Sequence, residues 1–160
     1  MMKLHRYNKV DNVKFYNQFV EQPKDGFVVT DYMAECFINI GVGLSHSKNF
    51  QGYTYRDEMI LDGIEQCIKY CRNFNPKKSK NPFSYFTQIT KNSFLRRMEK
   101  EKKQQYIVAK LNSIKYDTPD PEWVVEWEVK MKVRLEKQRE RGSGLHKFFK
   151  EKSGFLLTSS

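Results

Sequence analysis

The sequence predicts an all-α protein: a compact helical domain followed by a linker, an extra helix and a short hydrophobic C-terminal tail. Apolar residues recur in several stretches at the three- and four-residue spacing of one helix face. Residues that favour helix starts and helix ends stand between these stretches. The chain has 160 residues, enough for one small helical core with appendages. We divide it into an N-terminal arm (1–27), a helical domain (28–115), a linker with a helix (116–141) and a tail (142–160).

The arm and the start of the domain meet at a turn around Pro23. Residues 10–20 predict a short helix that this turn ends. Residues 27–41 predict a longer helix capped by Thr30. Its inward residues are expected to be Tyr32, Met33, Cys36, Phe37 and Ile40.

The centre of the domain is a pair of helices between Tyr55 and Lys103, joined by a basic turn that contains a proline. The first helix is expected to have Thr54 as its N-cap, with Asp57 three residues later as in a capping box. Its apolar stripe closes only at helical pitch and consists of Ile60, Ile64, Cys67, Ile68 and Cys71.

The second helix of the pair is expected to begin after Asn81, which serves as its N-cap, with Pro82 at the first helical position. Its buried side is expected to consist of Phe86, Ile89 or Thr90, Phe94 and Met98. Residues 104–115 either prolong this helix or pack back on it. Prolines then predict a linker, after which a helix runs to about Arg141 and ends at the glycines of residues 142–144.

Positive charge is concentrated in the central helices and the turn between them. Residues 69–115 contain thirteen Lys and Arg and two acidic residues, whereas the whole chain carries a net charge of +10. The second helix interleaves aromatic, amide and basic side chains: Tyr85, Phe86, Thr87, Gln88, Lys91, Asn92, Arg96 and Arg97. The turn adds Lys77, Lys78 and Lys80. This mixture suits a partly single-stranded nucleic acid, because rings stack on bases and cations neutralise phosphates. The alternative is an aromatic core stripe beside an ordinary solvated basic face.

The sequence contains no recognisable catalytic constellation or metal-ligand motif. Its three histidines are scattered, and Cys36, Cys67 and Cys71 lie in apolar stripes, as expected for reduced core thiols. No apolar run approaches the length of a membrane span. We therefore predict a protein that is not an enzyme, needs no cofactor or metal, and has no membrane partner.

The segment from Glu58 to Arg97 resembles region 2 of bacterial sigma factors. With its flanks it is similar to the late-transcription sigma factors of T-even-type phages. The likeness covers about residues 28–105 and is strongest over residues 43–103, where an acidic helix, a basic turn and an aromatic-amide-basic helix follow one another. The resemblance implies a sigma domain 2 fold and a role in promoter recognition in the host cell cytoplasm.

The resemblance also implies two binding surfaces in the central pair. In the family, the first helix binds the coiled coil in the largest subunit of core RNA polymerase, and Glu58 and Asp62 fall on the matching acidic positions. Helical spacing places four residues on one face that is roughly opposite the apolar stripe: Glu58, Leu61, Asp62 and Glu65.

On the second helix, Tyr85 matches the tyrosine that stacks on a flipped promoter base in the family. Thr87, Lys91, Asn92 and Arg96 match further DNA-contacting positions. Gln88 and Ile89 stand where primary sigma factors have a pair of tryptophans. Either Phe83 or Phe86 would therefore hold the duplex fork open, or the promoter would be an easily melted A·T-rich −10-type element.

The tail carries two short hydrophobic motifs. Leu145, Phe148 and Phe149 have the spacing of sliding-clamp-binding peptides, and Phe155, Leu156 and Leu157 form a second candidate near the C-terminus, where the phage family has a clamp-binding motif. Exposed aromatic residues on a polar tail suit a partner pocket. The alternative is that they fold back on the body of the protein.

Together these features predict a phage late sigma factor whose partners are core RNA polymerase, promoter DNA, a sliding clamp and a late co-activator. A region 2 without a helix–turn–helix segment has little sequence specificity of its own, which is why additional partners are expected. Two other functions remain open. One is a basic nucleic-acid-binding protein that acts without polymerase, and the other is an inhibitor of the host sigma factor.

Overall fold

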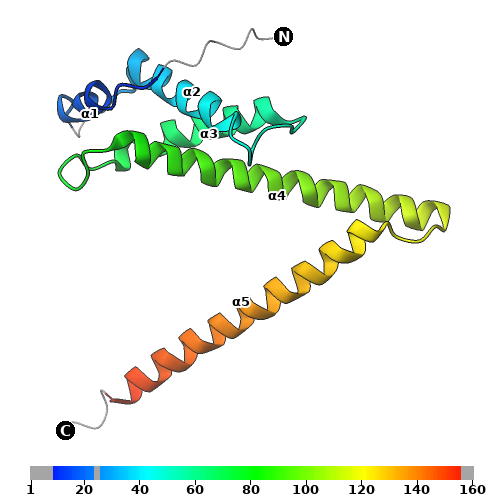
Figure 1. Ribbon diagram of the computed structural model, residues 1–160. Coiled ribbons are helices and arrows are strands. Elements are labelled where there is room, and N and C mark those ends of the chain that lie inside the picture. The colour runs from blue at the N-terminus through cyan, green and yellow to red at the C-terminus, as the bar shows by residue number, and fades with distance from the viewer. Residues whose placement is uncertain (1–8, 24–25, 156–160) are drawn as a thin grey trace. The chain divides into compact units, whose positions relative to one another are not determined.

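The computed structural model describes residues 9–23 and 26–155, with side chains as far as residue 142, and the regular structure in these residues is helical (Figure 1). This confirms the all-α prediction. The elements are α1 (Asn12–Val20), α2 (Asp31–Ser45), α3 (Arg56–Tyr70), the 3-10 turn η1 (Cys71–Asn73), α4 (Pro82–Tyr116) and α5 (Glu122–Phe155). The chain divides into two compact units, Met1–Lys102 and Lys103–Ser160, and the division falls within α4.

Local capping chemistry decides where most of these helices begin. The side chains of Asp11, Thr30 and Asn81 each accept a hydrogen bond from a backbone N–H in the first turn of α1, α2 and α4, respectively. Thr30 and Asn81 were predicted as caps, but α2 begins at Asp31 and not at residue 27. The prediction that Thr54 is the N-cap of α3 was wrong. The residue before the helix is Tyr55, and no side chain caps the helix.

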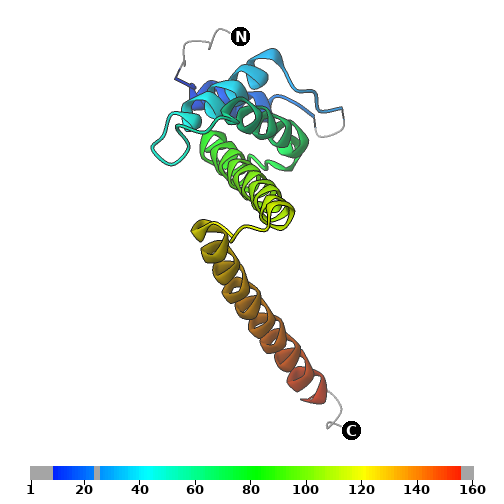
Figure 2. The same cartoon turned by 90° about the vertical axis from the view of Figure 1, so that its right-hand side faces the viewer.

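In the first unit, α1, α2 and α3 lie on the same side of the first part of α4 in both views (Figure 1, Figure 2). The core that joins them is built from phenylalanines. The Phe86 ring of α4 lies 5.5 Å from Phe15, 5.5 Å from Phe19 and 4.8 Å from Phe37, measured between ring centroids. Phe15 and Phe19 belong to α1, so residues 12–20, which the sequence assigns to an N-terminal arm, pack into the core of the helical unit.

A second cluster lies where α3 crosses α4, and it depends on Gly63. A Cβ atom at this position would lie 2.9 Å from Cγ2 of Thr90 and 3.1 Å from Cε1 of Phe94. One turn later, Sγ of Cys67 lies 3.3 Å from Oγ1 of Thr90, and burial raises the pKa of the Cys67 thiol to about 11. Cys67 therefore remains a neutral thiol that packs in the interface between the two helices.

The close approach at Gly63 changes which side of α3 is buried. Met59, Ile60, Gly63 and Cys67 are buried, whereas Ile68 is 45% exposed. The apolar stripe predicted from the sequence includes Ile68 but neither Met59 nor Gly63. The difference arises because a residue without a side chain allows α4 to lie directly against that part of α3.

We expect Gly63→Ala to lower the free energy of unfolding by about 1–3 kcal/mol, because the added methyl group would overpack a closed interface. Thermal or urea denaturation measures this change. Gly142→Ala in α5 is the matched control, because nothing lies within 4 Å of a Cβ at that position. Alanine favours a helix over glycine by about 1 kcal/mol, so the control should be neutral or stabilising. Equal effects of the two substitutions would contradict the close approach.

The second unit contains the end of α4, a short linker and α5. Asp117 has a φ of 48°, and the N–H of Thr118 donates to the carbonyl of Ser113, a Schellman-type end to α4. Of the two alternatives for residues 104–115, the structure shows that they prolong the second helix, and the predicted linker follows it. The sequence predicts that the last helix ends at residues 142–144, but α5 continues through them to Phe155.

Side chains of α4 and α5 meet around Tyr106. Its ring lies 4.4 Å from that of Trp127, and its hydroxyl donates a hydrogen bond of 2.7 Å to Glu128. Lys110 forms ion pairs with Asp120 and Glu128. Hydrogen bonds from Tyr106 and Lys110 lower the pKa of Glu128, and the bond from Lys110 lowers the pKa of Asp120. Asp120 and Glu128 are therefore both ionised at neutral pH.

Candidate nucleic-acid interface

Phe86, one of the two rings expected to hold a DNA fork open, is 0% exposed. It sits in the centre of the phenylalanine core described above, and Phe15, Phe19 and Phe37 surround it. A ring enclosed in this way has no face available to a base. The assignment of Phe86 to DNA binding was therefore wrong, and its assignment to the buried side of the helix was right.

Tyr85 occupies the neighbouring position on α4 but only part of it is buried. The centroid of its ring lies 5.3 Å from that of Phe74 and 5.1 Å from that of Phe86, with the planes nearly perpendicular in the second pair. Burial raises the pKa of Tyr85, so the phenol is neutral at physiological pH. Its hydroxyl makes no hydrogen bond to another described residue. Tyr85 is thus a ring held by core aromatics with part of its surface open to solvent.

The solvent side of α4 continues from Tyr85 through amide and basic groups. Gln88, Lys91, Asn92 and Arg96 are exposed. The side chain of Gln88 donates a hydrogen bond of 2.9 Å to Asn92, and Arg96 donates one of 3.4 Å to Gln66 of α3. No short-range pattern in the sequence indicated the role of Gln66, because it lies thirty residues from its partner.

Helix geometry separates these groups into two sides. Residues 85, 88, 92 and 96 follow the spacing of one face, whereas consecutive residues point about 100° apart, so Lys91 projects from another side than Asn92. Thr87 lies on the side of Lys91, is half-buried, and donates its hydroxyl to the carbonyl of Phe83 at 2.7 Å.

The basic turn before α4 is anchored at its backbone, while its lysine side chains remain exposed. The hydroxyl of Tyr16 donates to the carbonyl of Pro76 at 3.0 Å, and the side chain of Asn75 accepts from the N–H of Lys77. The exposed side chains are those of Lys77, Lys78 and Lys80. The turn therefore presents three cations next to Phe74, whose ring supports Tyr85.

The start of α4 is also fixed by α1. The side chain of Asn12 accepts a hydrogen bond of 3.1 Å from the N–H of Phe83, whose own ring is half-buried against the core. The sequence patterns do not predict that Asn12, Tyr16 and Phe74 position the basic turn and the start of α4. Phe74 carried one usable signal, which is its place as the last apolar residue before the polar turn.

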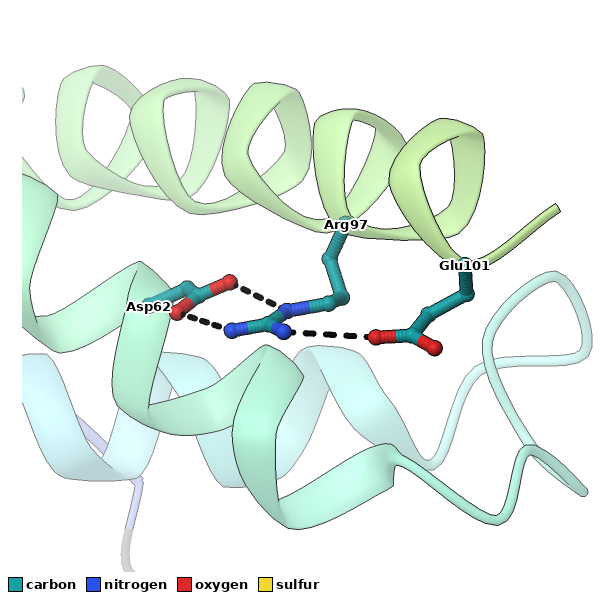
Figure 3. Close-up of polar contacts among 3 residues, drawn as sticks. All are labelled: Asp62, Arg97 and Glu101. Atoms are coloured by element: carbon teal, nitrogen blue, oxygen red, sulfur yellow. Dashed lines mark hydrogen bonds and ion pairs between the residues drawn. The ribbon is translucent and has the colours of Figure 1, made fainter. Parts of the chain in front are cut away.

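Asp62 and Arg97 were assigned to opposite surfaces, polymerase-binding and DNA-binding respectively, but the structure pairs them with each other (Figure 3). The guanidinium of Arg97 donates two hydrogen bonds to Asp62, of 2.6 and 2.7 Å, and a third to Glu101 at 3.3 Å. The bonds to Asp62 raise the pKa of Arg97 further. We therefore correct both assignments, because these side chains tie α3 to α4 and are not free surface groups.

This ion-pair cluster predicts unequal effects of its two members. Asp62→Ala leaves Arg97 with Glu101, whereas Arg97→Ala leaves both carboxylates without that cation. We expect Arg97→Ala to destabilise the protein more, and the double variant to be less destabilised than the sum of the single variants by about 1 kcal/mol. Urea denaturation of the three variants measures this coupling. Additive effects would indicate that the pair contributes nothing to stability.

The outward face of α3 combines acidic and apolar groups. Glu58 and Glu65 are exposed, and Leu61 between them is 60% exposed. Ile68 extends the same face by one further turn. Three of the four residues predicted for this surface are therefore accessible together, and Asp62 is the exception.

The residues predicted to bind a sliding clamp lie outside those whose side chains are described. They are Leu145, Phe148, Phe149, Phe155, Leu156 and Leu157. The backbone of residues 143–155 belongs to α5.

Other site chemistry is sparse in the described part of the chain. Cys36, Cys67 and Cys71 are free and buried there. Among the same residues, no group of three or more His, Cys, Asp or Glu side chains is arranged to hold a metal ion. None of the helices in this part combines the length and the apolar character needed to cross a bilayer.

Comparison with known proteins adds no family assignment. No protein-family model matches the chain. No curated protein matches it at a significant level.

Proposed function

We propose that this protein is a sigma-type promoter-specificity subunit, which binds core RNA polymerase through α3 and opens an A·T-rich −10-type promoter with α4. The observation that carries the proposal is the placement of Tyr85. Its ring is fixed against Phe74 yet remains partly accessible, at the start of a helix whose solvent side carries amide and basic groups.

The chemistry of this side of α4 fits unpaired DNA. Stacking of a base on an aromatic ring contributes about 1–3 kcal/mol, which offsets much of the few kcal/mol needed to extrude it. A ring already held in place loses little conformational entropy when a base stacks on it. Lys77, Lys78, Lys80 and Arg96 are exposed cations that can neutralise phosphates on either side of such a base.

The proposed fork-opening residue is Phe83, since Phe86 is enclosed. Phe83 is half-buried at the first turn of α4, two residues before Tyr85. One partly exposed phenylalanine gives a smaller wedge than a pair of tryptophans, so the target is expected to be an A·T-rich element that melts easily.

The outward face of α3 supports the second half of the proposal. Exposed Glu58 and Glu65 flank exposed Leu61, a combination that can give both charge steering and an apolar anchor for a basic helical partner. We propose that this partner is the coiled coil of the largest polymerase subunit. The sliding clamp and a late co-activator remain proposed partners of the tail.

A run-off transcription assay with purified core polymerase on an A·T-rich −10 template tests the function. We expect specific transcripts only when the protein is added. A protein that binds any duplex with steep salt dependence but gives no transcript would be a polymerase-independent nucleic-acid-binding protein. One that binds polymerase and blocks transcription by the host sigma factor would be an inhibitor.

A further inference from the structure

Helix α5 is apolar on two sides, and only one of them packs within the second unit. Val124 is fully buried, and Trp127 and Met131 are half-buried on the side that meets the end of α4. Val125, Val129 and Val133 form a second ridge at i, i+4 and i+8, with exposed fractions of 49%, 56% and 43%. By helical geometry Val129 lies roughly opposite Trp127.

The charges along α5 are divided along its length. Within α5, residues 122–128 contain three acidic residues and no basic one, although Glu128 also pairs with Lys110, whereas residues 130–136 contain three basic residues and one acidic residue. The division falls at Val129, which is also the middle of the valine ridge. Two such helices in antiparallel orientation would place each valine of one ridge against a valine of the other. They would also place each acidic half against a basic half.

From this symmetry we propose that α5 pairs with α5 of a second copy of this chain, antiparallel, across a two-fold axis at Val129. Residue 125 of one copy then meets residue 133 of the other, and Val129 meets its own counterpart. A surface that is complementary to itself in this way forms a closed dimer, because each copy uses the same patch.

The outward side of α4 in the second unit does not offer the same complementarity. Ile107, Leu111 and Ile114 form an exposed ridge there at i, i+4 and i+7. Residues 103–115 contain three lysines and no acidic residue. Pairing of this ridge with its own copy would therefore bring like charges together, which favours α5 as the self-association surface.

Sedimentation equilibrium of the full chain over a wide concentration range tests the proposal. We expect a monomer–dimer equilibrium for the wild type and a monomer for Val129→Glu. Leu111→Glu is the matched control, because it places the same charge on an exposed apolar ridge of the same unit, and it should still dimerise. Circular dichroism checks that both variants keep their helix content. A monomeric wild type at the highest concentration, or equal loss of dimer in both variants, would overturn the proposal.

Cross-linking with a short bismaleimide tests the orientation. Val129→Cys is expected to cross-link to itself, and a mixture of Val125→Cys with Val133→Cys is expected to give a cross-linked heterodimer. Val125→Cys alone should give little product, since its counterpart lies two turns away along the partner helix. Efficient cross-linking of Val125→Cys alone would indicate parallel helices and contradict the two-fold axis at Val129. Each variant is compared with the wild type, whose own cysteines are buried.

Discussion

Phe86→Ala is expected to lower the free energy of unfolding by about 3–5 kcal/mol, the range found when a fully buried aromatic ring is removed. Phe86 is 0% exposed and contacts phenylalanines from both α1 and α2. The loss would be a large part of the total stability of a small domain. Chemical denaturation measures it directly.

Phe83→Ala is the control for this prediction, since Phe83 lies three residues earlier on the same helix and is only half-buried. It should destabilise much less, yet impair strand opening if Phe83 is the fork-opening ring. If Phe86→Ala proved as stable as the wild type and lost only DNA binding, the placement of Phe86 in the core would be contradicted.

Glu58→Lys combined with Glu65→Lys is expected to weaken binding to core polymerase by at least about a hundredfold. Both side chains are exposed on the outward face of α3, so the fold should persist. Charge reversal against a basic partner replaces attraction with repulsion, which costs several kcal/mol, and about 1.4 kcal/mol corresponds to a tenfold change in affinity.

The matched control for the charge reversal is Glu122→Lys with Glu126→Lys, which makes the same change in net charge on exposed residues of α5. Co-purification with core polymerase should survive in this control and be lost in the α3 variant. Equal retention by both variants would remove α3 as the docking surface. Loss in both would attribute binding to overall charge.

Features governed by local chemistry could be predicted from the sequence. The cap residues Thr30 and Asn81 act through hydrogen bonds within one helical turn, and the linker after α4 follows from its prolines. The local rules failed at the predicted end of α5, where the glycines disfavour a helix only weakly. Gly142 and Gly144 disfavour a helix by only about 1 kcal/mol each, and α5 continues through them.

Features that depend on distant parts of the chain could not be predicted in the same way. Asp62 and Arg97 are thirty-five residues apart, and their pairing requires the crossing of α3 over α4. The burial of Gly63 in place of Ile68 has the same origin. For Phe86, composition favoured base stacking and helical spacing favoured the core, and only the packed α1 decides between them.

The central claim is that Tyr85 captures an extruded base while α3 holds polymerase, and permanganate footprinting tests it most directly. Thymines in the A·T-rich element should become reactive in complexes of core polymerase with the wild-type protein. With Tyr85→Ala they should remain largely unreactive, although the variant still co-purifies with polymerase. Reactivity equal to that of the wild type, or parallel loss of polymerase binding, would contradict the claim.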